Sequence, residues 1–303
     1  MNDLNEKRVL ITGGAGFLGS NLAIKIQQKF PSCRLVVFDS FRTGHFKNLL
    51  SYRGELIVGD TIVDRARLDS RKFDCIFHLI GEANEAKQLL QVNAFKDMLD
   101  FAVQNGADLV YASSSQVYGD SPSAGNGSEK PCTVEGFAKL MMDNLALEYL
   151  KEESINIAGL RFFEIYGERE VYKGKASSLI LRMALTILSG AKPKLYRWGE
   201  HRQDFIYIDD AVNALLKSVS RRGIYDIGTG QAREHNEVFG ALTSVLDANV
   251  KVEFTDPPER LFQGVADTAR AWNEFDFQAE YDLEEGIKKY VPSIMEIYEK
   301  ELR

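Results

Sequence analysis

Short runs of apolar residues alternate with longer segments of helical periodicity through the first half of the chain. The longer segments predict helices over 17–29, 83–104 and 135–151. The apolar runs are nearly continuous, which is typical of strands in a parallel sheet that helices cover on both faces. These runs predict strands at Arg8–Thr12, Arg34–Phe38, Leu56–Val58, Asp74–His78, Asp108–Tyr111 and Ile155–Ala158. Strands and helices that alternate in this order predict an α/β fold with a doubly wound parallel sheet.

The pattern becomes looser in the second half of the chain. Residues 175–189 have helical periodicity, and Asp204–Ile208 and Ile224–Ile227 are two further strand candidates. We therefore predict two units, a sheet domain and a smaller C-terminal α/β lobe. The sheet domain is expected to comprise residues 1–165 and about 204–230, and the lobe about 166–203 and 231–303.

The composition excludes several classes of protein. The 303 residues include 37 Lys and Arg against 44 Asp and Glu, and this acidic balance argues against a broad nucleic-acid or membrane-binding face. The three cysteines and four histidines lack the spacing of a disulfide framework or a metal site, so we expect no metal. The N-terminus is polar up to Val9, and no apolar run approaches the ~18 residues of a membrane span. We expect a soluble cytoplasmic protein.

A glycine-rich segment follows the first predicted strand and opens the first predicted helix. Gly13, Gly16 and Gly19 are three residues apart, with Phe17 and Leu18 between the last two. The first glycine permits a tight turn, the second removes a Cβ that would block a diphosphate, and the third lets helix and strand approach closely. The N–H groups at the start of the helix attract the anion. This context predicts a dinucleotide-binding site in a Rossmann domain.

The end of the second predicted strand carries the residues expected to hold the adenosine ribose. Asp39 lies 20 residues beyond Gly19, where a carboxylate accepts hydrogen bonds from ribose hydroxyls. Arg42, three residues further on, could instead contact a 2′-phosphate. The sequence therefore predicts NAD or NADP as the cofactor and leaves the choice open.

Several dispersed motifs resemble those of the extended short-chain dehydrogenase/reductase family, which acts mostly on nucleotide sugars. The resemblance covers nearly the whole chain and includes the Gly-x-x-Gly-x-x-Gly spacing. The other motifs are Gly59-Asp60, His78–Gly81, Tyr111–Gly119, Arg161–Gly167, Asp204–Asp210 and Tyr225–Gly230. Within the family, Asp39–Gly44, Arg169–Gly174 and Gly223–Gly230 resemble segments of the branch of heptose 6-epimerases.

The resemblance implies roles for individual residues. Asp60 would contact the adenine, Ser114 would bind the substrate in the active site, and Lys139 would contact the nicotinamide ribose. Lys173 stands where the heptose 6-epimerases carry a lysine that acts as acid or base on the sugar. An enzyme of that branch oxidises its substrate transiently with a bound nicotinamide and returns the hydride to the other face.

The position of the family's catalytic tyrosine, four residues before Lys139, is occupied by Glu135. A phenol has a pKa of about 10 and a glutamic acid one of about 4.3, so a carboxylate is the weaker base by roughly six units. A Glu four residues before a Lys also stabilises a helix by pairing with it. The residue is therefore either a proton-transfer group or a helix-stabilising partner of Lys139.

Two further positions of the expected substrate pocket depart from the family pattern. Glu164 replaces an asparagine and Gln203 replaces an arginine, and both positions usually lie near the substrate diphosphate. With Glu135, these changes make the pocket about three charges more negative, which disfavours a dianion. Either another cation compensates or the substrate lacks a diphosphate. The candidate compensating residues are Arg202, His201 and Lys173.

The leading hypothesis is an NAD(P)-dependent nucleotide-sugar epimerase of the heptose 6-epimerase kind, in which Glu135 and Lys173 transfer protons. Ser115-Gln116 stands where the 4,6-dehydratases have Asp-Glu, which disfavours dehydration. Because the tyrosine is absent, two alternatives stay open: a non-redox isomerase or lyase that uses Glu135, and a dinucleotide-binding sensor or assembly protein. The resemblance also implies a homodimer or larger homo-oligomer.

Overall fold

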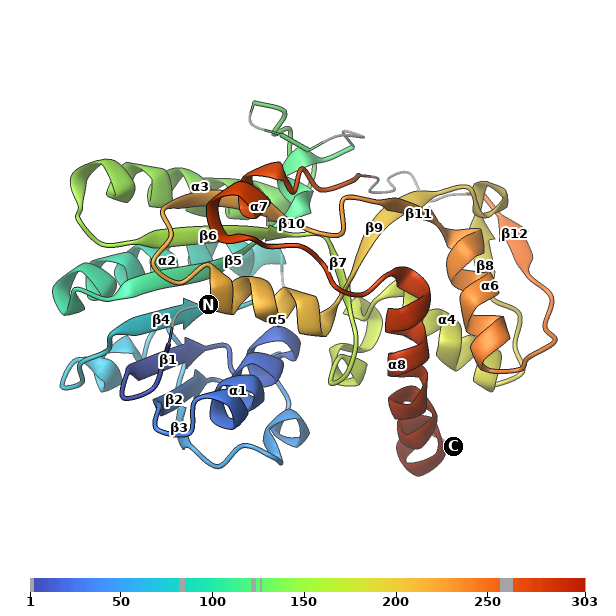
Figure 1. Cartoon of the computed structure of the whole chain (residues 1–303), viewed down its shortest axis with the longest axis horizontal. Helices are drawn as coiled ribbons and strands as arrows, with labels where there is room; N and C mark the ends of the chain where they lie inside the picture. Colours follow the sequence, from blue (N-terminus) through green and yellow to red (C-terminus); the bar gives the residue numbers. More distant parts are fainter. Residues whose placement is uncertain (1–2, 82–84, 121–123, 126, 257–263, 303) are drawn as a thin grey trace.

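A computed structural model describes residues 3–81, 85–120, 124–125, 127–256 and 264–302 of the chain. Its centre is a seven-stranded parallel sheet in the order β10-β6-β5-β4-β1-β2-β3 (Figure 1). The strands are β1 (Arg8–Thr12), β2 (Arg34–Asp39), β3 (Glu55–Val58), β4 (Cys75–His78), β5 (Asp108–Ser114), β6 (Ile157–Phe162) and β10 (Gly223–Ile227). The predicted doubly wound sheet is confirmed, and its strand order reverses between β1 and β4, where α/β proteins bind ligands.

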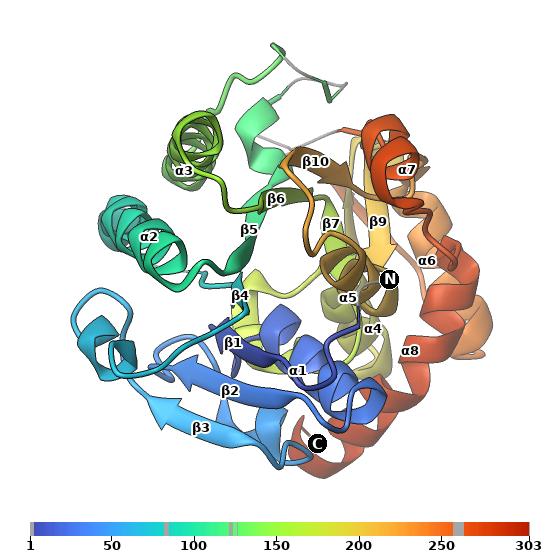
Figure 2. The same cartoon turned by 60° about the vertical axis from the view of Figure 1, so that its left-hand side comes forward.

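Helices cover both faces of this sheet (Figure 2), which explains why the strands are apolar at nearly every position. In β1, Leu10 packs in the cluster that α2 and α3 cover, whereas its neighbours Val9 and Ile11 pack in the cluster that α1 and α5 cover. The four helices are α1 (Phe17–Lys29), α2 (Glu85–Asn105), α3 (Val134–Glu152) and α5 (Ile208–Lys217).

The C-terminal lobe, on the right in Figure 1, is built from short strands and three further helices. Its three-stranded sheet has the order β11-β9-β7, and its two-stranded sheet pairs β12 with β8. The strands are β7 (Glu164–Tyr166), β8 (Lys194–Tyr196), β9 (Arg202–Tyr207), β11 (Ala232–Glu234) and β12 (Glu253–Thr255). The helices are α4 (Leu179–Leu188), α6 (His235–Val245) and α8 (Leu283–Ile297), while α7 (Ala269–Phe275) lies beside β10.

The structure shifts the bounds of several predicted strands, and β5 continues beyond Tyr111 to Ser114. β6 begins at Ile157 and continues to Phe162, beyond the predicted end at Ala158. Arg161 interrupts the apolar run in the sequence, but in the fold its ion pairs allow it to be buried within the strand. The predicted strand at Asp204–Ile208 is β9, which starts at Arg202, and Ile208 already begins α5. β9 lies in the smaller sheet whereas β10 joins the central one, so the division into domains stays a prediction. The start of the helix expected at 83 lies outside the described residues.

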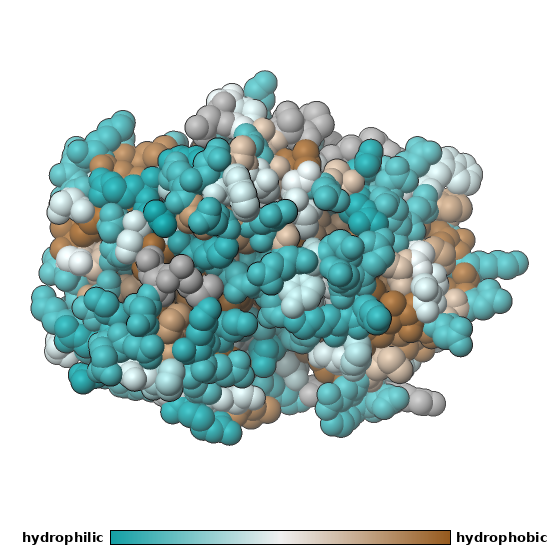
Figure 3. All heavy atoms as spheres, in the orientation of Figure 1, coloured by the Kyte–Doolittle hydropathy of each residue, from teal (hydrophilic) through white to brown (hydrophobic). Residues whose placement is uncertain are grey.

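Hydrophilic residues cover most of the face in Figure 3, with apolar patches towards its left and right edges. The exposed apolar side chains include Leu89 on α2, Phe137 on α3, and the neighbouring rings of Trp198 and Phe254 in the lobe. None of the helices described is long and apolar enough to span a membrane. Within the same residues, no group of three or more His, Cys, Asp or Glu side chains could hold a metal ion.

Candidate active site

The glycine-rich segment forms a tight turn at the carboxyl end of β1, beside the point where the strand order reverses. Gly13 has a φ of +76°, and a Cβ there would lie 2.7 Å from the carbonyl oxygen of Leu79. A Cβ on Gly19 would collide with the carbonyl oxygen of Gly13, so α1 packs directly on the turn. Gly16 caps α1 without a side-chain hydrogen bond, which leaves first-turn N–H groups available to an anion. The turn therefore fits the diphosphate of a dinucleotide.

Asp39 joins the end of β2 to this turn. Its Oδ2 accepts a hydrogen bond of 2.8 Å from the N–H of Ala15, and its Oδ1 accepts one of 2.7 Å from the N–H of Phe41. Burial raises the pKa of the Asp39 carboxyl, and the two N–H donors oppose that rise. The carboxylate is thus held rigidly beside the turn, at the position expected for a group that binds the ribose.

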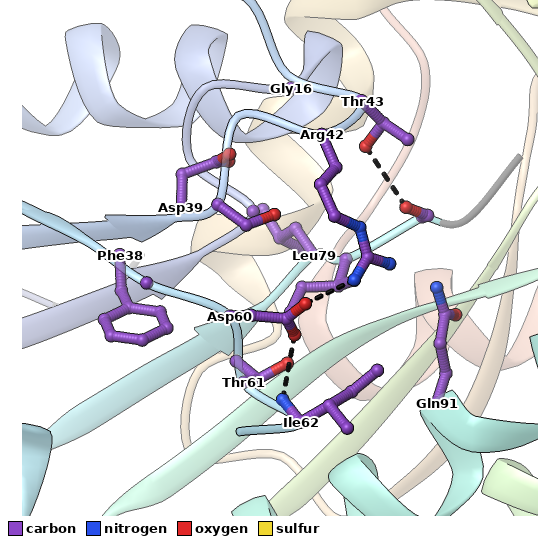
Figure 4. A pocket seen from close by; sticks show the side chains of 15 residues that line it. Gly16, Phe38, Asp39, Arg42, Thr43, Asp60, Thr61, Ile62, Leu79 and Gln91 are labelled. Atoms are coloured by element: carbon purple, nitrogen blue, oxygen red, sulfur yellow. Dashed lines mark hydrogen bonds and ion pairs between the residues drawn. The ribbon is translucent and has the colours of Figure 1, made fainter. Parts of the chain in front are cut away.

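A pocket opens between the glycine turn and the ends of β2, β3 and β4 (Figure 4). Five of the residues expected to bind the cofactor line it: Gly13, Gly16, Asp39, Arg42 and Asp60. Phe17, Leu18 and Gly19 lie in the first turn of α1 and are not among the described lining residues. Arg42 forms an ion pair with Asp60 inside the pocket, and Gln91 of α2 adds a polar side chain that the sequence motifs did not indicate.

Glu135 lies in the first turn of α3 and is held by its neighbours. Thr133 caps this helix by accepting a hydrogen bond of 3.0 Å from the N–H of Gly136. The Thr133 hydroxyl donates to Oε1 of Gln116 at 2.8 Å, and Nε2 of Gln116 donates to Oε2 of Glu135 at 3.1 Å. Among the described residues nothing else hydrogen-bonds to this carboxylate, so its Oε1 is left for a ligand.

Lys139 lies one helical turn beyond Glu135 and is buried. Its ammonium donates a hydrogen bond of 2.8 Å to the carbonyl oxygen of Ala112 at the end of β5. Burial lowers the pKa of Lys139, whereas the carboxylates of Glu135 and Asp143 raise it. Burial and the nearby Lys139 lower the pKa of His78 to about 3, so the imidazole is neutral and its Nδ1 pairs with the Thr12 hydroxyl at 2.9 Å.

Ser114 ends β5 and caps the 3₁₀ turn η3 (Ser115–Tyr118). Its Oγ accepts a hydrogen bond of 3.2 Å from the N–H of Gln116, whose side chain holds Glu135. The hydroxyl of Ser114 donates to no other described residue. The end of β5 and the start of α3 thus bring Ser114, Glu135 and Lys139 into one site.

A buried network around Arg161 fixes the position of α3. The guanidinium Nε donates to Asp143 of α3 at 2.8 Å, and its Nη1 donates to Glu129 and to the Tyr118 hydroxyl at 2.8 and 2.7 Å. Tyr118 in turn donates to Asp226 at 2.7 Å. Burial raises the pKa of Asp226 to about 6, although Tyr118 and Arg161 oppose the rise. Arg161 therefore links β6 to α3 through its buried ion pair with Asp143.

Glu164, Lys173 and Arg182 carry charges on the side of the C-terminal lobe, and Glu135 of α3 faces them electrostatically. Desolvation raises the pKa of the Glu164 carboxyl, the charges of Lys173 and Arg182 lower it, and the charge of Glu135 raises it. The Glu164 residue is exposed to solvent. The Lys173 ammonium lies 5.1 Å from the centroid of the Phe17 ring, at the start of α1. Lys173 thus lies beside the start of α1, where its charge also acts on Glu164.

Arg182 was not singled out from the sequence, where it appears as one arginine in the apolar run of α4. In the structure the charges of Arg182 and of Lys173, one of the three candidate compensating residues, both lower the pKa of Glu164. Arg202 is exposed and donates to the carbonyl oxygen of Ala232 at 3.1 Å, and His201 is buried against the ring of His235. The remaining position, Gln203, binds Nε2 of His235 through its Oε1 at 3.0 Å.

The chain is similar to known proteins along most of its length. Residues 9–228 match the model of the NAD-dependent epimerase/dehydratase family. The crystal structure of ADP-L-glycero-D-manno-heptose-6-epimerase from Helicobacter pylori is 36% identical, with a TM-score of 0.91 over 97% of this chain and 98% of that one. MoeE5 in complex with UDP-glucose and NAD is 25% identical, with a TM-score of 0.81 over 95% and 99% of the two chains. A UDP-N-acetylglucosamine 4-epimerase from Methanobrevibacter ruminantium M1, 22% identical, shares the fold with a TM-score of 0.88 over 98% and 99%.

Proposed function

Because the chain belongs to the NAD-dependent epimerase/dehydratase family, we propose that it is a nucleotide-sugar epimerase of the heptose 6-epimerase kind. Similarity to the Helicobacter pylori heptose epimerase along the full length of both chains supports this substrate class. The observation that carries the proposal is the site itself, in which the buried Lys139 and the fixed Glu135 lie together at the end of β5. Such an arrangement suits chemistry on a sugar beside a bound dinucleotide.

The family is NAD-dependent, and the residues of the pocket fit NAD. The turn at Gly13 and Gly16 would hold the diphosphate, Asp39 and Asp60 the adenosine, and Lys139 the nicotinamide ribose. When bound, the nicotinamide supplies a hydride acceptor that can return the hydride to the same carbon. All other steps fall to side chains of this chain.

Glu135 takes the proton of the sugar hydroxyl as its carbon is oxidised. The Gln116 amide donates a hydrogen bond to this carboxylate and so holds it in place to accept the proton. The Lys139 ammonium lies one turn away, where a positive charge stabilises the alkoxide that forms. Ser114 would orient the same hydroxyl, because its own hydroxyl still has a proton to donate. Lys173 would exchange a second proton with the sugar from the side of the lobe.

The charges of the lobe support a substrate that carries a diphosphate. Lys173 and Arg182 act on Glu164 and offset the negative charge that Glu135 and Glu164 bring to the site. Of the two, Arg182 is the one proposed to recognise phosphate oxygens, through its planar guanidinium. A nucleoside diphosphate sugar therefore remains the substrate class that we propose.

A second copy of the chain is the proposed partner. Helices α2 and α3 pack against each other on one face of the sheet and expose Leu89, Leu90, Phe137 and Met141. Pairing these faces in a two-fold homodimer would bury the four side chains, because the same surface patch of each subunit meets in such an interface. Mass measurement in solution, by light scattering on the wild type and on the Phe137→Lys variant, tests this assembly.

One observation favours a second candidate, a non-redox isomerase or lyase. Desolvation raises the pKa of the Glu164 carboxyl, and a second carboxyl group near Glu135 with a raised pKa can act as an acid in such a reaction. The two candidates are distinguished by incubating the protein with ADP-heptoses and UDP-sugars in deuterated water. Transient reduced nicotinamide with interconversion of epimers supports the epimerase, whereas solvent exchange without reduction supports the alternative. Binding of NAD with no change in any sugar would favour a sensor.

A further inference from the structure

Arg42 and Asp60 form an ion pair within the cofactor pocket, at the end where the adenosine is expected. Arg42 extends from the segment after β2 to Asp60, which follows β3, and Figure 4 shows the two side chains meeting inside the pocket. Asp60 is fixed in place, because its Oδ2 pairs with Arg42 while its Oδ1 accepts a hydrogen bond of 2.9 Å from the N–H of Ile62. The N–H of Asp60 donates to Asp64 at 3.0 Å. The carboxylate therefore holds the guanidinium from a rigid position.

The charges around this pair are unfavourable for an additional anion. The charged side chains among the described lining residues are Asp39, Asp60 and Arg42, which sum to −1. Asp39 cannot turn away, because both of its oxygens accept backbone hydrogen bonds. The 2′-hydroxyl of an adenosine ribose is neutral, whereas a 2′-phosphate carries about −1.5 to −2. A phosphate would thus meet two carboxylates and one guanidinium that is already paired.

We infer that Asp60 is a specificity-determining residue: through its ion pair it withholds Arg42 from a 2′-phosphate, so that the chain selects NAD over NADP. Arg42 is the residue that could otherwise bind such a phosphate, as arginines in this position of dinucleotide sites do. The competition is between an intramolecular carboxylate that is always present and a ligand phosphate in solution. The inference rests on the proposed use of a dinucleotide but is independent of the reaction on the sugar.

The test measures binding of NAD⁺ and NADP⁺ to the purified full chain by calorimetry, after removal of any copurified nucleotide. The wild type is expected to bind NAD⁺ at least about tenfold more tightly. Asp60→Asn should reduce this preference at least tenfold, mainly by strengthening the binding of NADP⁺. The charge-matched double variant Arg42→Met with Asp60→Asn should lose that gain. Asp69→Asn breaks the exposed pair of Asp69 with Arg65, with the same change of charge, and should leave the preference within about twofold.

Each outcome decides the inference. A wild type that binds NADP⁺ as tightly as NAD⁺, or a preference that survives Asp60→Asn, would overturn it. A gain that persists in the double variant would show that Arg42 is not the residue involved, which also overturns it. Binding of neither dinucleotide would remove this inference together with the proposed function. Selective binding of NAD⁺ by a protein that changes no sugar would contradict the epimerase alone.

Discussion

Nε2 of Gln116 donates a hydrogen bond of 3.1 Å to the carboxylate of Glu135. The direction of this bond is fixed, because the Thr133 hydroxyl donates to the other end of the same amide at 2.8 Å. Thr133 in turn accepts a hydrogen bond from Gly136, so its hydroxyl proton is directed to Gln116. The chain of bonds delivers a donor to Glu135 and anchors the carboxylate to the end of β5.

Replacing Gln116 by methionine keeps the shape of the side chain and removes both hydrogen bonds. We expect kcat to fall about tenfold, because a hydrogen bond to a charged group contributes roughly 1.5–3 kcal/mol. KM should change less than about threefold, since Gln116 is not proposed to touch the substrate. Steady-state kinetics of both epimerisation directions measure the two constants.

The matched control is Gln27→Met, which also removes hydrogen bonds at both ends of a glutamine amide. Gln27 donates to the carbonyl oxygen of Ser51 and accepts from the N–H of Arg53, away from the site. The control should retain kcat within about twofold. Equal losses in the two variants would mean that Gln116 acts only on folding.

Lys173 is predicted to exchange a proton with the sugar, so Lys173→Met should lower kcat by about 100-fold. Its ammonium lies over the ring of Phe17 and its side chain is exposed, so stability should change little. Lys175→Met, two residues further along the same exposed segment, is the control and should remain active. Thermal unfolding and turnover of the two variants are measured side by side; similar activity in both would contradict the role of Lys173.

Arg182 is predicted to bind the substrate rather than to take part in proton transfer. Arg182→Gln should raise KM about tenfold and leave kcat within about threefold, because one charge-assisted contact to phosphate is lost. Lys192→Gln, an exposed lysine beyond the end of α4, removes a positive charge from the same lobe as a control. A fall in kcat at unchanged KM in Arg182→Gln would contradict the assignment.

The raised pKa of Asp226 makes the stability of the fold depend on pH. Its pKa is raised to about 6 by burial, above the ordinary value of 3.8, so the native state binds the proton more tightly than the unfolded one. Its stabilising effect is therefore present below about pH 4 and is lost as the pH rises through 6, by up to about 3 kcal/mol. Urea unfolding from pH 4.5 to pH 8 should show this loss in the wild type and less of it in Asp226→Asn. The same slope in both proteins would contradict the assignment.

The parts of the structure that depend on local pattern could be predicted from the sequence. The strand at Arg8–Thr12 and the helix at Phe17–Lys29 have the expected bounds, because the apolar run, the glycines and Pro31 define them locally. The pocket at the glycine turn follows from the same residues, and it includes Asp39 and Asp60 from the next two strands. A parallel sheet brings these strand ends together at one edge whatever the loops contain.

Features that depend on contacts between distant segments could not be predicted. No motif in the sequence assigns a role to the Gln116 side chain. It holds Glu135 only because the fold places it against the start of α3, 19 residues further along the chain. Arg182 and Glu164 come from different elements, and their mutual effect depends on how the lobe folds back. Arg161 interrupts an apolar run, so the sequence pattern does not predict the second half of β6. In the fold its ion pairs with Asp143 and Glu129 make it part of the core.

Glu135 is proposed to replace the family's tyrosine as the group that takes a proton from the sugar. The most direct measurement follows the interconversion of ADP-heptose 6-epimers by NMR in the wild type and in Glu135→Gln, both loaded with NAD. We expect interconversion by the wild type and a loss of at least about 100-fold in the variant, with binding of NAD unchanged. An active variant, with a rate within a few-fold of the wild type, would contradict the proton-transfer role of Glu135.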